Sequence, residues 1–196
     1  MIRSDLRPLL ILAFFMALFV AVSNFLVQYP INYFGLEKFL TYGAISYPAT
    51  FLITDLANRR YGKIIARKIV YIGFILGISL TLFFSTNFSD LISIRVAVGS
   101  GTAFLMAQLL DVQIFDRLRK KIWFIAPLVS SSIGSFIDTF LFFFIAFYGT
   151  NFNWPTLALG DFFVKIFMAL IMLIPFRMLM SKLKDAKIDS IKISPI

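Results

Sequence analysis

Two charged side chains stand inside otherwise apolar stretches of this sequence. Asp138 lies in SFIDTFLFFF and Lys165 lies in GDFFVKIF. A carboxylate and an ammonium group are each costly in an apolar environment and are tolerated there when they pair. Such a pair either holds two segments together or lines a site for a polar molecule. Asp161 precedes Lys165 by one helical turn and competes with Asp138 as its partner.

Two further aspartates each precede a basic run. Asp55 lies in ITDLANRRYGK, and Asp111 lies in LLDVQIFDRLRK. The shared layout indicates a weak internal repeat. Each carboxylate forms either an ordinary ion pair with the nearby cations or part of a functional site, and the sequence leaves both interpretations open.

Amides and hydroxyls in the apolar stretches extend the candidate site. Buried groups of this kind need hydrogen-bond partners, which either a ligand or a neighbouring helix supplies. The residues that we expect to bind a substrate are Asn24, Gln28, Asp55, Gln108, Asp111, Ser135, Asp138 and Lys165.

The composition excludes several chemistries. The 196 residues include no Cys and no His, which excludes disulfides, thiolate chemistry, His-based metal sites and a Ser-His-Asp triad. The sequence has no Walker-type phosphate loop. The Gly-x-Gly-Asp signature of intramembrane aspartyl proteases is absent, and residues 158–161 only partly resemble it. We therefore expect no enzyme activity, no cofactor and no metal.

The elements that must position these groups are membrane-spanning helices. The chain is 60% hydrophobic and 15% charged, with a mean hydropathy of +0.89, whereas soluble domains are about a quarter charged. We predict an all-α, polytopic membrane protein, with residues 1–196 forming one domain. Since a span needs about 20 apolar residues, we predict six spans, at about 9–27, 42–56, 69–84, 96–115, 124–148 and 157–180.

The cations predict the orientation of these spans. Every Lys and Arg except Lys38, Arg95 and Lys165 falls on one side of the predicted topology. Because cytoplasmic loops are rich in Lys and Arg, both termini are predicted to be cytoplasmic. The net charge of +9 is explained by this topology and needs no nucleic acid as a partner.

Two local patterns predict how the spans pack. Pro48 lies in the second span, where it favours a kink. Small residues recur at four-residue spacing, a pattern that permits close helix contact. They are Ala13, Ala17 and Ala21 in the first span and Gly73 and Gly77 in the third.

Several stretches resemble the queuosine precursor transporter family of bacterial membranes. They are SNFLVQYP from Ser23, YPATFLITDLANRRYGKIIAR from Tyr47, LLDVQIFDRLRK from Leu109, WFIAPLVSSSIGSFIDTFLFFFIAF from Trp123 and GDFFVKIFMALIMLIP from Gly160. They occur in the right order and cover nearly the whole chain, which makes the resemblance more specific than any single motif.

The resemblance implies uptake of the cyano- and aminomethyl-deazaguanine precursors of the tRNA nucleoside queuosine, across the bacterial inner membrane. By this resemblance Asn24, Asp55, Arg59, Arg67, Asp111, Arg117, Asp138 and Lys165 fall on signature positions. One departure is clear: Gly134 and Ser135 stand where the family typically has Gly-Asn. This chain therefore either reads the base differently or prefers another base.

The residue chemistry fits a planar base. A guanine-like edge offers an N–H beside an amino group, and one carboxylate accepts from both. Asp138 is the first choice for this role, and Asn24 or Gln108 suits the carbonyl edge. We also predict a cytoplasmic gate at Asp55, Arg59, Arg67 and Arg117, in which Asp55 pairs with a cation of the loop after the fourth span.

A second function remains open from the sequence. The substrate-binding subunits of energy-coupling-factor importers also have six spans and often an alanine-spaced first helix, as at Ala13, Ala17 and Ala21. The sequence leaves open whether the chain forms a homodimer.

Overall fold

The computed structural model describes residues 6–27, 29–33, 41–84 and 86–191, with side chains described between residues 9 and 180 of these ranges. All regular elements in this part of the chain are helices, apart from one isolated bridge between Pro30 and Thr41. The helices are α1 (Leu6–Leu26), α2 (Tyr42–Ser46), α3 (Pro48–Tyr61), α4 (Lys63–Phe84), α5 (Leu91–Leu118), α6 (Ile125–Phe147) and α7 (Trp154–Ile191). The all-α prediction is therefore confirmed for the described residues.

Five of these helices are long and apolar enough to cross a bilayer, namely α1, α4, α5, α6 and α7. The predicted second span at 42–56 is not one helix: it is divided into α2 and α3, and α3 continues to Tyr61. The chain is therefore a multi-pass membrane protein, and a sixth crossing built from α2 and α3 together stays a prediction.

The break between α2 and α3 follows from Pro48. Proline lacks the backbone N–H that would donate the next hydrogen bond of α2, whereas this lack is tolerated in the first turn of a helix. Tyr47 before it keeps helical backbone angles, φ −60° and ψ −39°. Pro48 is the first residue of α3, as the predicted kink requires. The hydroxyl of Thr50 donates to the carbonyl oxygen of Tyr47 at 2.8 Å, which satisfies one backbone acceptor at the break. The Tyr47 side chain at this break is buried, and its hydroxyl reaches Asp138 on α6.

The predicted contact of small residues is confirmed between α1 and α4. The α-carbon of Gly73 faces Met16 and the carbonyl oxygen of Ala13, and Gly77 faces Val20 and the carbonyl oxygen of Ala17. A larger side chain at either glycine would occupy the space that α1 fills. The alanines thus serve the contact between α1 and α4.

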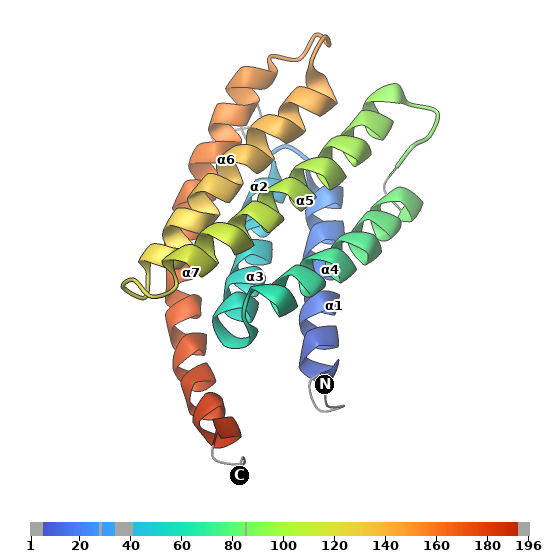
Figure 1. Ribbon diagram of the computed structural model, residues 1–196. Helices are drawn as coiled ribbons and strands as arrows, with labels where there is room; N and C mark the ends of the chain where they lie inside the picture. Colours follow the sequence, from blue (N-terminus) through green and yellow to red (C-terminus); the bar gives the residue numbers. More distant parts are fainter. Residues whose placement is uncertain (1–5, 28, 34–40, 85, 192–196) are drawn as a thin grey trace.

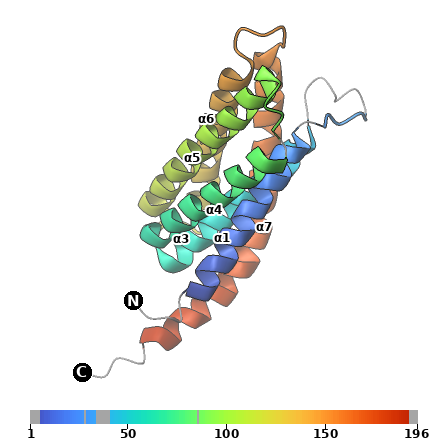
Figure 2. The same cartoon turned by 90° about the vertical axis from the view of Figure 1, so that its right-hand side faces the viewer.

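The bundle has two distinct ends (Figure 1). We name as the basic end the one that holds the start of α1 and the end of α7, together with the connection at Gly62 and residues 119–124. The opposite end holds the connections at 86–90 and 148–153. Figure 2 shows that α7 runs along the whole bundle and extends past the other helices at the basic end. The cations around the connection at Gly62 and around residues 119–124, which were predicted to lie on one side of the membrane, thus lie at one end of the bundle.

We predict that the basic end faces the cytoplasm, and the absence of native Cys makes the prediction easy to test. Ser93 lies at the opposite end and Lys120 is exposed at the basic end. In intact cells a membrane-impermeant maleimide should label Ser93→Cys and should spare Lys120→Cys until the membrane is permeabilised. The reverse labelling pattern would contradict the predicted orientation.

Close packing of α2 on α1 gives a stability prediction. A β-carbon on Gly43 would lie 2.8 Å from the carbonyl oxygen of Ser23 and 2.9 Å from the amide nitrogen of Val27, both of which are backbone atoms. Gly43→Ala should therefore push α2 from α1 and lower the midpoint of thermal unfolding in detergent. Gly101→Ala is the matched control, because its nearest contact is the flexible end of Ile78. Equal midpoints for both variants would contradict the packing argument.

Candidate functional site

A hollow at the opposite end of the bundle leads to the buried charges. Its outer part, which we name the vestibule, holds about 1160 Å³ of empty space, including its open mouth. The vestibule is lined by polar groups of the connection before α5, among them Thr86, Asn87 and Asp90. It shares Asn24, Val27, Ser100 and Phe142 with a narrower pocket, which we name the inner pocket and which holds about 390 Å³ of empty space, including its open mouth.

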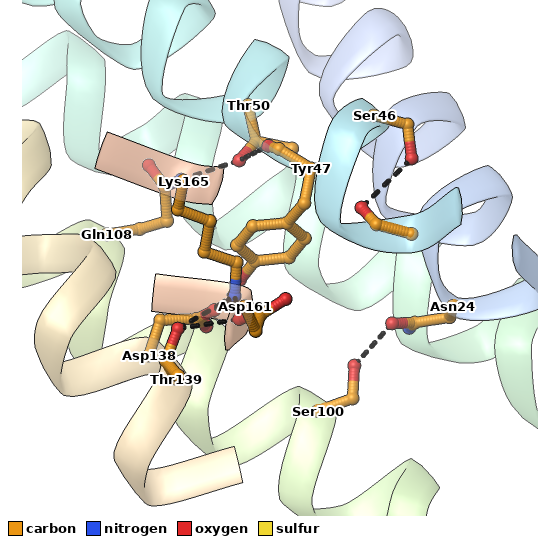
Figure 3. A network of polar contacts seen from close by, with 11 residues as sticks. Asn24, Ser46, Tyr47, Thr50, Ser100, Gln108, Asp138, Thr139, Asp161 and Lys165 are labelled. Carbon is orange, nitrogen blue, oxygen red and sulfur yellow. Dashed lines mark hydrogen bonds and ion pairs between the residues drawn. The ribbon is translucent and has the colours of Figure 1, made fainter. Parts of the chain in front are cut away.

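The inner pocket ends on a cluster of three charged side chains (Figure 3). The Lys165 Nζ atom lies 2.8 Å from Asp138 Oδ2 and 2.6 Å from Asp161 Oδ2. All three residues are buried, with exposed fractions of 4%, 4% and 7% for Lys165, Asp138 and Asp161. The predicted pair of Asp138 and Lys165 is therefore confirmed, and Asp161 is a second partner and not a competitor.

Two hydroxyl groups complete the cluster. The Tyr47 hydroxyl donates to Asp138 Oδ1 at 2.6 Å, and the Thr139 hydroxyl donates to Asp161 Oδ2 at 2.7 Å. Lys165 also donates to Thr139 Oγ1 at 3.1 Å, and its ammonium group lies 4.8 Å from the centre of the Tyr47 ring. The side chains come from α6, α7 and the break before α3, so the cluster joins three separate parts of the bundle.

The electrostatics of the cluster favour a ligand that donates hydrogen bonds or carries positive charge. Two carboxylates face one ammonium group, which leaves one net negative charge in a buried place. Each carboxylate oxygen accepts up to two hydrogen bonds. Asp138 Oδ1 and Oδ2 have one described donor each, Tyr47 and Lys165. Asp138 can therefore accept further N–H donors from a molecule in the inner pocket.

Asn24 lies at the mouth of the inner pocket, as expected for a substrate-binding residue. Its amide nitrogen donates to Thr81 Oγ1 at 2.9 Å, and its carbonyl oxygen accepts from Ser100 Oγ at 2.6 Å. These bonds connect α1 to α4 and α5. Thr81 uses one of the two amide hydrogens of Asn24, and Ser100 uses one of the two lone pairs of its carbonyl oxygen. A ligand can bind only the remaining hydrogen and lone pair.

Gln108 does not reach either the inner pocket or the vestibule. It is fully buried, accepts from Thr54 Oγ1 at 2.5 Å and donates to Thr50 Oγ1 at 2.9 Å. The structure therefore does not bring Gln108 to the pocket where we expect the base to bind. Its amide groups instead join α5 to α3, because the two threonines on one face of α3 supply both hydrogen-bond partners.

Two other predicted site residues lie elsewhere. Ser135 is buried beside a separate crevice of about 310 Å³ between α3, α6 and α7, which also borders Asp55 and Ser131. We name it the side crevice. Gln28 lies outside the described residues. Neither residue joins the charged cluster in the part of the chain that the structure describes.

Asp55 and Asp111 form a second polar cluster, nearer the basic end. Asp55 Oδ1 accepts from Ser130 Oγ at 3.4 Å, and Oδ2 accepts from Ser131 Oγ at 3.2 Å. Asp111 is fully buried beside Asp55. Neither carboxylate forms an ion pair with a described cation. The interpretation of these residues as ordinary interfacial ion pairs is therefore wrong.

The contacts that close the basic end differ from the predicted gate. Arg119, and not Arg117, bridges the two connections: it donates to the carbonyl oxygens of Asn58 and Arg59, each at 3.0 Å. Arg59 donates in return to the carbonyl oxygen of Arg119 at 2.6 Å. Arg117 is exposed and takes part in none of these contacts.

Arg67 contributes in another way. It donates to Gln113 Oε1 at 2.9 Å and so joins α4 to α5. The predicted pairing of Asp55 with a cation after the fourth span does not occur among the described residues, where Arg119 binds backbone carbonyls and Asp116 instead. The closure at the basic end is thus made mainly by arginine and carbonyl groups.

Sequence reasoning missed Tyr47 and Ser100, which line the inner pocket, and Thr139, which contacts the charged cluster. Tyr47 stands directly before Pro48, and the kink predicted there marks its position but not the direction of its side chain. Thr139 and Ser100 carry no comparable signal, since hydroxyl groups are common on helix faces.

Comparisons with known proteins agree with this arrangement. Residues 41–180 match the family described as "Putative vitamin uptake transporter". The chain is 34% identical over 200 residues to a protein of Haemophilus influenzae named "Probable queuosine precursor transporter", covering 86% of this chain and 84% of that one. It is 32% identical over 203 residues to the "Queuosine precursor transporter" of Escherichia coli, covering 91% of each. No solved structure matches significantly.

The matched region holds both polar clusters, the break at Tyr47 and the side crevice. The relatives are named as transporters and not as enzymes. The chain therefore belongs to the vitamin uptake transporter family and is a multi-pass membrane protein of that family.

Proposed function

We propose that this chain imports queuosine precursors, the cyano- and aminomethyl-deazaguanine bases, across the bacterial inner membrane. The observation that carries the proposal is the buried cluster of Asp138, Lys165 and Asp161 at the closed end of a vestibule. The names of the two relatives supply the substrate class.

The carboxylates suit the donor edge of such a base. A ring N–H and a neighbouring amino group present two parallel donors, and a carboxylate accepts both in a charge-assisted arrangement. In our proposal Asp138 accepts this edge, because it borders the inner pocket and retains acceptor capacity beside Tyr47 and Lys165. Asp161 borders the same pocket and offers a second acceptor.

The other walls of the pocket suit the rest of the ring. Tyr47 and Phe142 offer aromatic surfaces at the pocket wall, whereas the three donors of Lys165 are already used by Asp138, Asp161 and Thr139. Aromatic faces favour planar ligands through offset or edge contacts. The net negative charge of the cluster adds attraction for the cationic aminomethyl group, so we expect the aminomethyl base to bind more tightly than the cyano base.

Access from the opposite end supports import. The vestibule opens between α4, α5 and α6 and narrows toward Asn24 and Ser100. The basic end is closed by Arg59 and Arg119. This arrangement fits an outward-facing form, and release to the other side requires a second form in which these contacts break.

The alanine-spaced face of α1, which favoured an energy-coupling-factor subunit in the sequence, packs inside this chain. The alanine-spaced face of α1 packs on Gly73 and Gly77 of α4. Ala13 and Ala17 are therefore buried inside this chain and are not free to contact a coupling module. This observation favours the stand-alone importer over a subunit of an energy-coupling-factor complex.

Reconstitution separates the two functions. Liposomes that contain only the purified chain should take up radiolabelled cyano- and aminomethyl-deazaguanine above the level of empty liposomes. Lys120→Gln is a control with unchanged uptake, because Lys120 is exposed at the basic end and lies outside both polar clusters. Binding of the bases without uptake would contradict the stand-alone importer and would favour the substrate-binding subunit.

A further inference from the structure

The cluster of Asp55 and Asp111 has too few hydrogens for its oxygen atoms. Asp111 is fully buried, and neither of its carboxylate oxygens has a hydrogen-bond partner. The two described donors are the hydroxyl groups of Ser130 and Ser131, and both are directed at Asp55. The Ser130 hydrogen is also shared with the carbonyl oxygen of Pro127 at 3.4 Å. The four carboxylate oxygens of the pair thus have only two hydroxyl donors among the described residues.

The two carboxyl groups are neighbours within reach of a hydrogen bond to each other. Two carboxylates cannot donate, so such a contact forms only when one of them carries a proton. Like charges at this separation strongly disfavour full ionisation of both groups, and aspartate pairs that share one proton are the known consequence. One added proton would supply the missing donor and remove the repulsion.

No cation near the pair takes the place of that proton in the described residues. On α3 the nearest is Arg59, one turn beyond Asp55, and it binds the carbonyl oxygen of Arg119. On α4 the facing cation is Arg67, which binds Gln113 of α5. The element α6 contributes Ser130, Ser131 and Ser135, and α7 contributes apolar residues of the side crevice, such as Met172 and Phe176. The next titratable residue on α5 is Asp116, which pairs with Lys63 and Arg119.

The pair is mechanically linked to the inner pocket. Asp55 lies on α3, and Tyr47 at the start of the same segment donates to Asp138. Ser131 lies on α6, seven residues before Asp138, which is about 10 Å along a helix. The two clusters thus share two segments, the one that begins at Tyr47 and α6, while α7 belongs to the first cluster and α5 to the second. A shift of α3 against α6 changes the distances in both clusters at once.

We propose that Asp55 and Asp111 together bind one proton that is taken up and released in each transport cycle, so that import is driven by a proton gradient. The step forms one O–H bond on a carboxyl group and later breaks it, with no other change of bonding. The proton arrives by way of the side crevice, which borders Asp55, or through the second form of the protein. This inference rests on the proposed function as a transporter.

Proton binding by Asp55 and Asp111 can be tested without any transport substrate. Infrared difference spectra of the purified protein between alkaline and acidic buffer should contain the carbonyl stretch of a buried protonated carboxyl group. We expect this band to be lost in Asp111→Asn and retained in Asp116→Asn. The amide introduced by Asp111→Asn resembles the protonated acid in shape, so the variant should fold, and Asp55→Asn provides a second variant with the same expected loss. A band that persists in both Asp111→Asn and Asp55→Asn would overturn the proposal.

The coupling is tested with liposomes that contain the wild type or Asp111→Asn. An inward proton gradient should drive the wild type to accumulate the cyano base, whereas the variant should still exchange labelled for unlabelled base and lose the gradient-driven accumulation. Accumulation that follows a sodium gradient, or wild-type uptake that ignores both gradients, would overturn the proton site and leave the importer intact. Failure of both proteins to take up or exchange any base would instead refute the proposed function, and the infrared result would still decide whether the pair holds a proton.

Discussion

Lys165→Met should give the largest loss of stability of any substitution in the charged clusters. The wild-type ammonium group lies 2.8 Å from Asp138 and 2.6 Å from Asp161, and all three side chains are buried. Removing it leaves two carboxylates facing each other without a counter-charge. Breaking a buried ion pair in this way costs about 3–5 kcal/mol. Thermal unfolding in detergent should show this as a large fall in the midpoint, together with loss of transport.

Two further variants test whether the lost stability of Lys165→Met comes from the missing buried charge and not from the change of side chain itself. Lys63→Met removes a lysine whose side chain is 45% exposed and whose ion pair with Asp116 is 3.6 Å long. Exposed pairs contribute about 0–1 kcal/mol, so its midpoint should stay near that of the wild type. The double variant Asp161→Asn with Lys165→Met restores one net negative charge and should recover part of the lost stability. A stable Lys165→Met protein would refute the counter-charge role.

Asp138→Asn should give the largest loss of base binding. The substitution preserves size and packing but replaces one acceptor oxygen with an NH₂ donor and removes the charge. Hydrogen bonds to a charged group contribute about 1.5–3 kcal/mol, so loss of a two-point contact should weaken binding by about 100-fold or more. Equilibrium binding of the radiolabelled cyano base measures this directly.

A control shows whether the loss is local. Asp55→Asn also removes a buried carboxylate, but it lies in the other cluster and not at the wall of the inner pocket. It should change binding far less than Asp138→Asn does. If Asp55→Asn and Asp138→Asn weaken binding equally, the carboxylate that reads the base has been assigned to the wrong cluster.

Much of the fold is predictable because membrane helices follow simple rules. The long apolar runs predicted five helices close to their observed positions, and Pro48 marked the break in the second span. The cost of an unpaired charge in an apolar segment predicted a pair of Asp138 and Lys165, and they do pair. These predictions succeeded because length, proline geometry and charge pairing act locally or along one helix axis.

The partners of buried polar groups were less predictable. Gln108 binds two threonines on α3, and Asp55 binds serines about seventy-five residues away on α6. Which helix faces which is decided by packing of the whole bundle, and one sequence contains no signal for it. For the same reason the sequence predicted a gate at Arg117, whereas Arg119 makes the contacts.

The central claim is that the Asp138 carboxylate in the inner pocket accepts the N–H and amino edge of the base. The most direct measurement compares two ligands on two proteins: the cyano base and an analogue lacking the ring amino group, each binding to the wild type and to Asp138→Asn. We predict that the wild type prefers the cyano base by at least about tenfold, the value of one charge-assisted hydrogen bond, and that the variant binds both ligands with similar, weak affinity. An undiminished preference in Asp138→Asn would show that another group reads this edge and would contradict the claim.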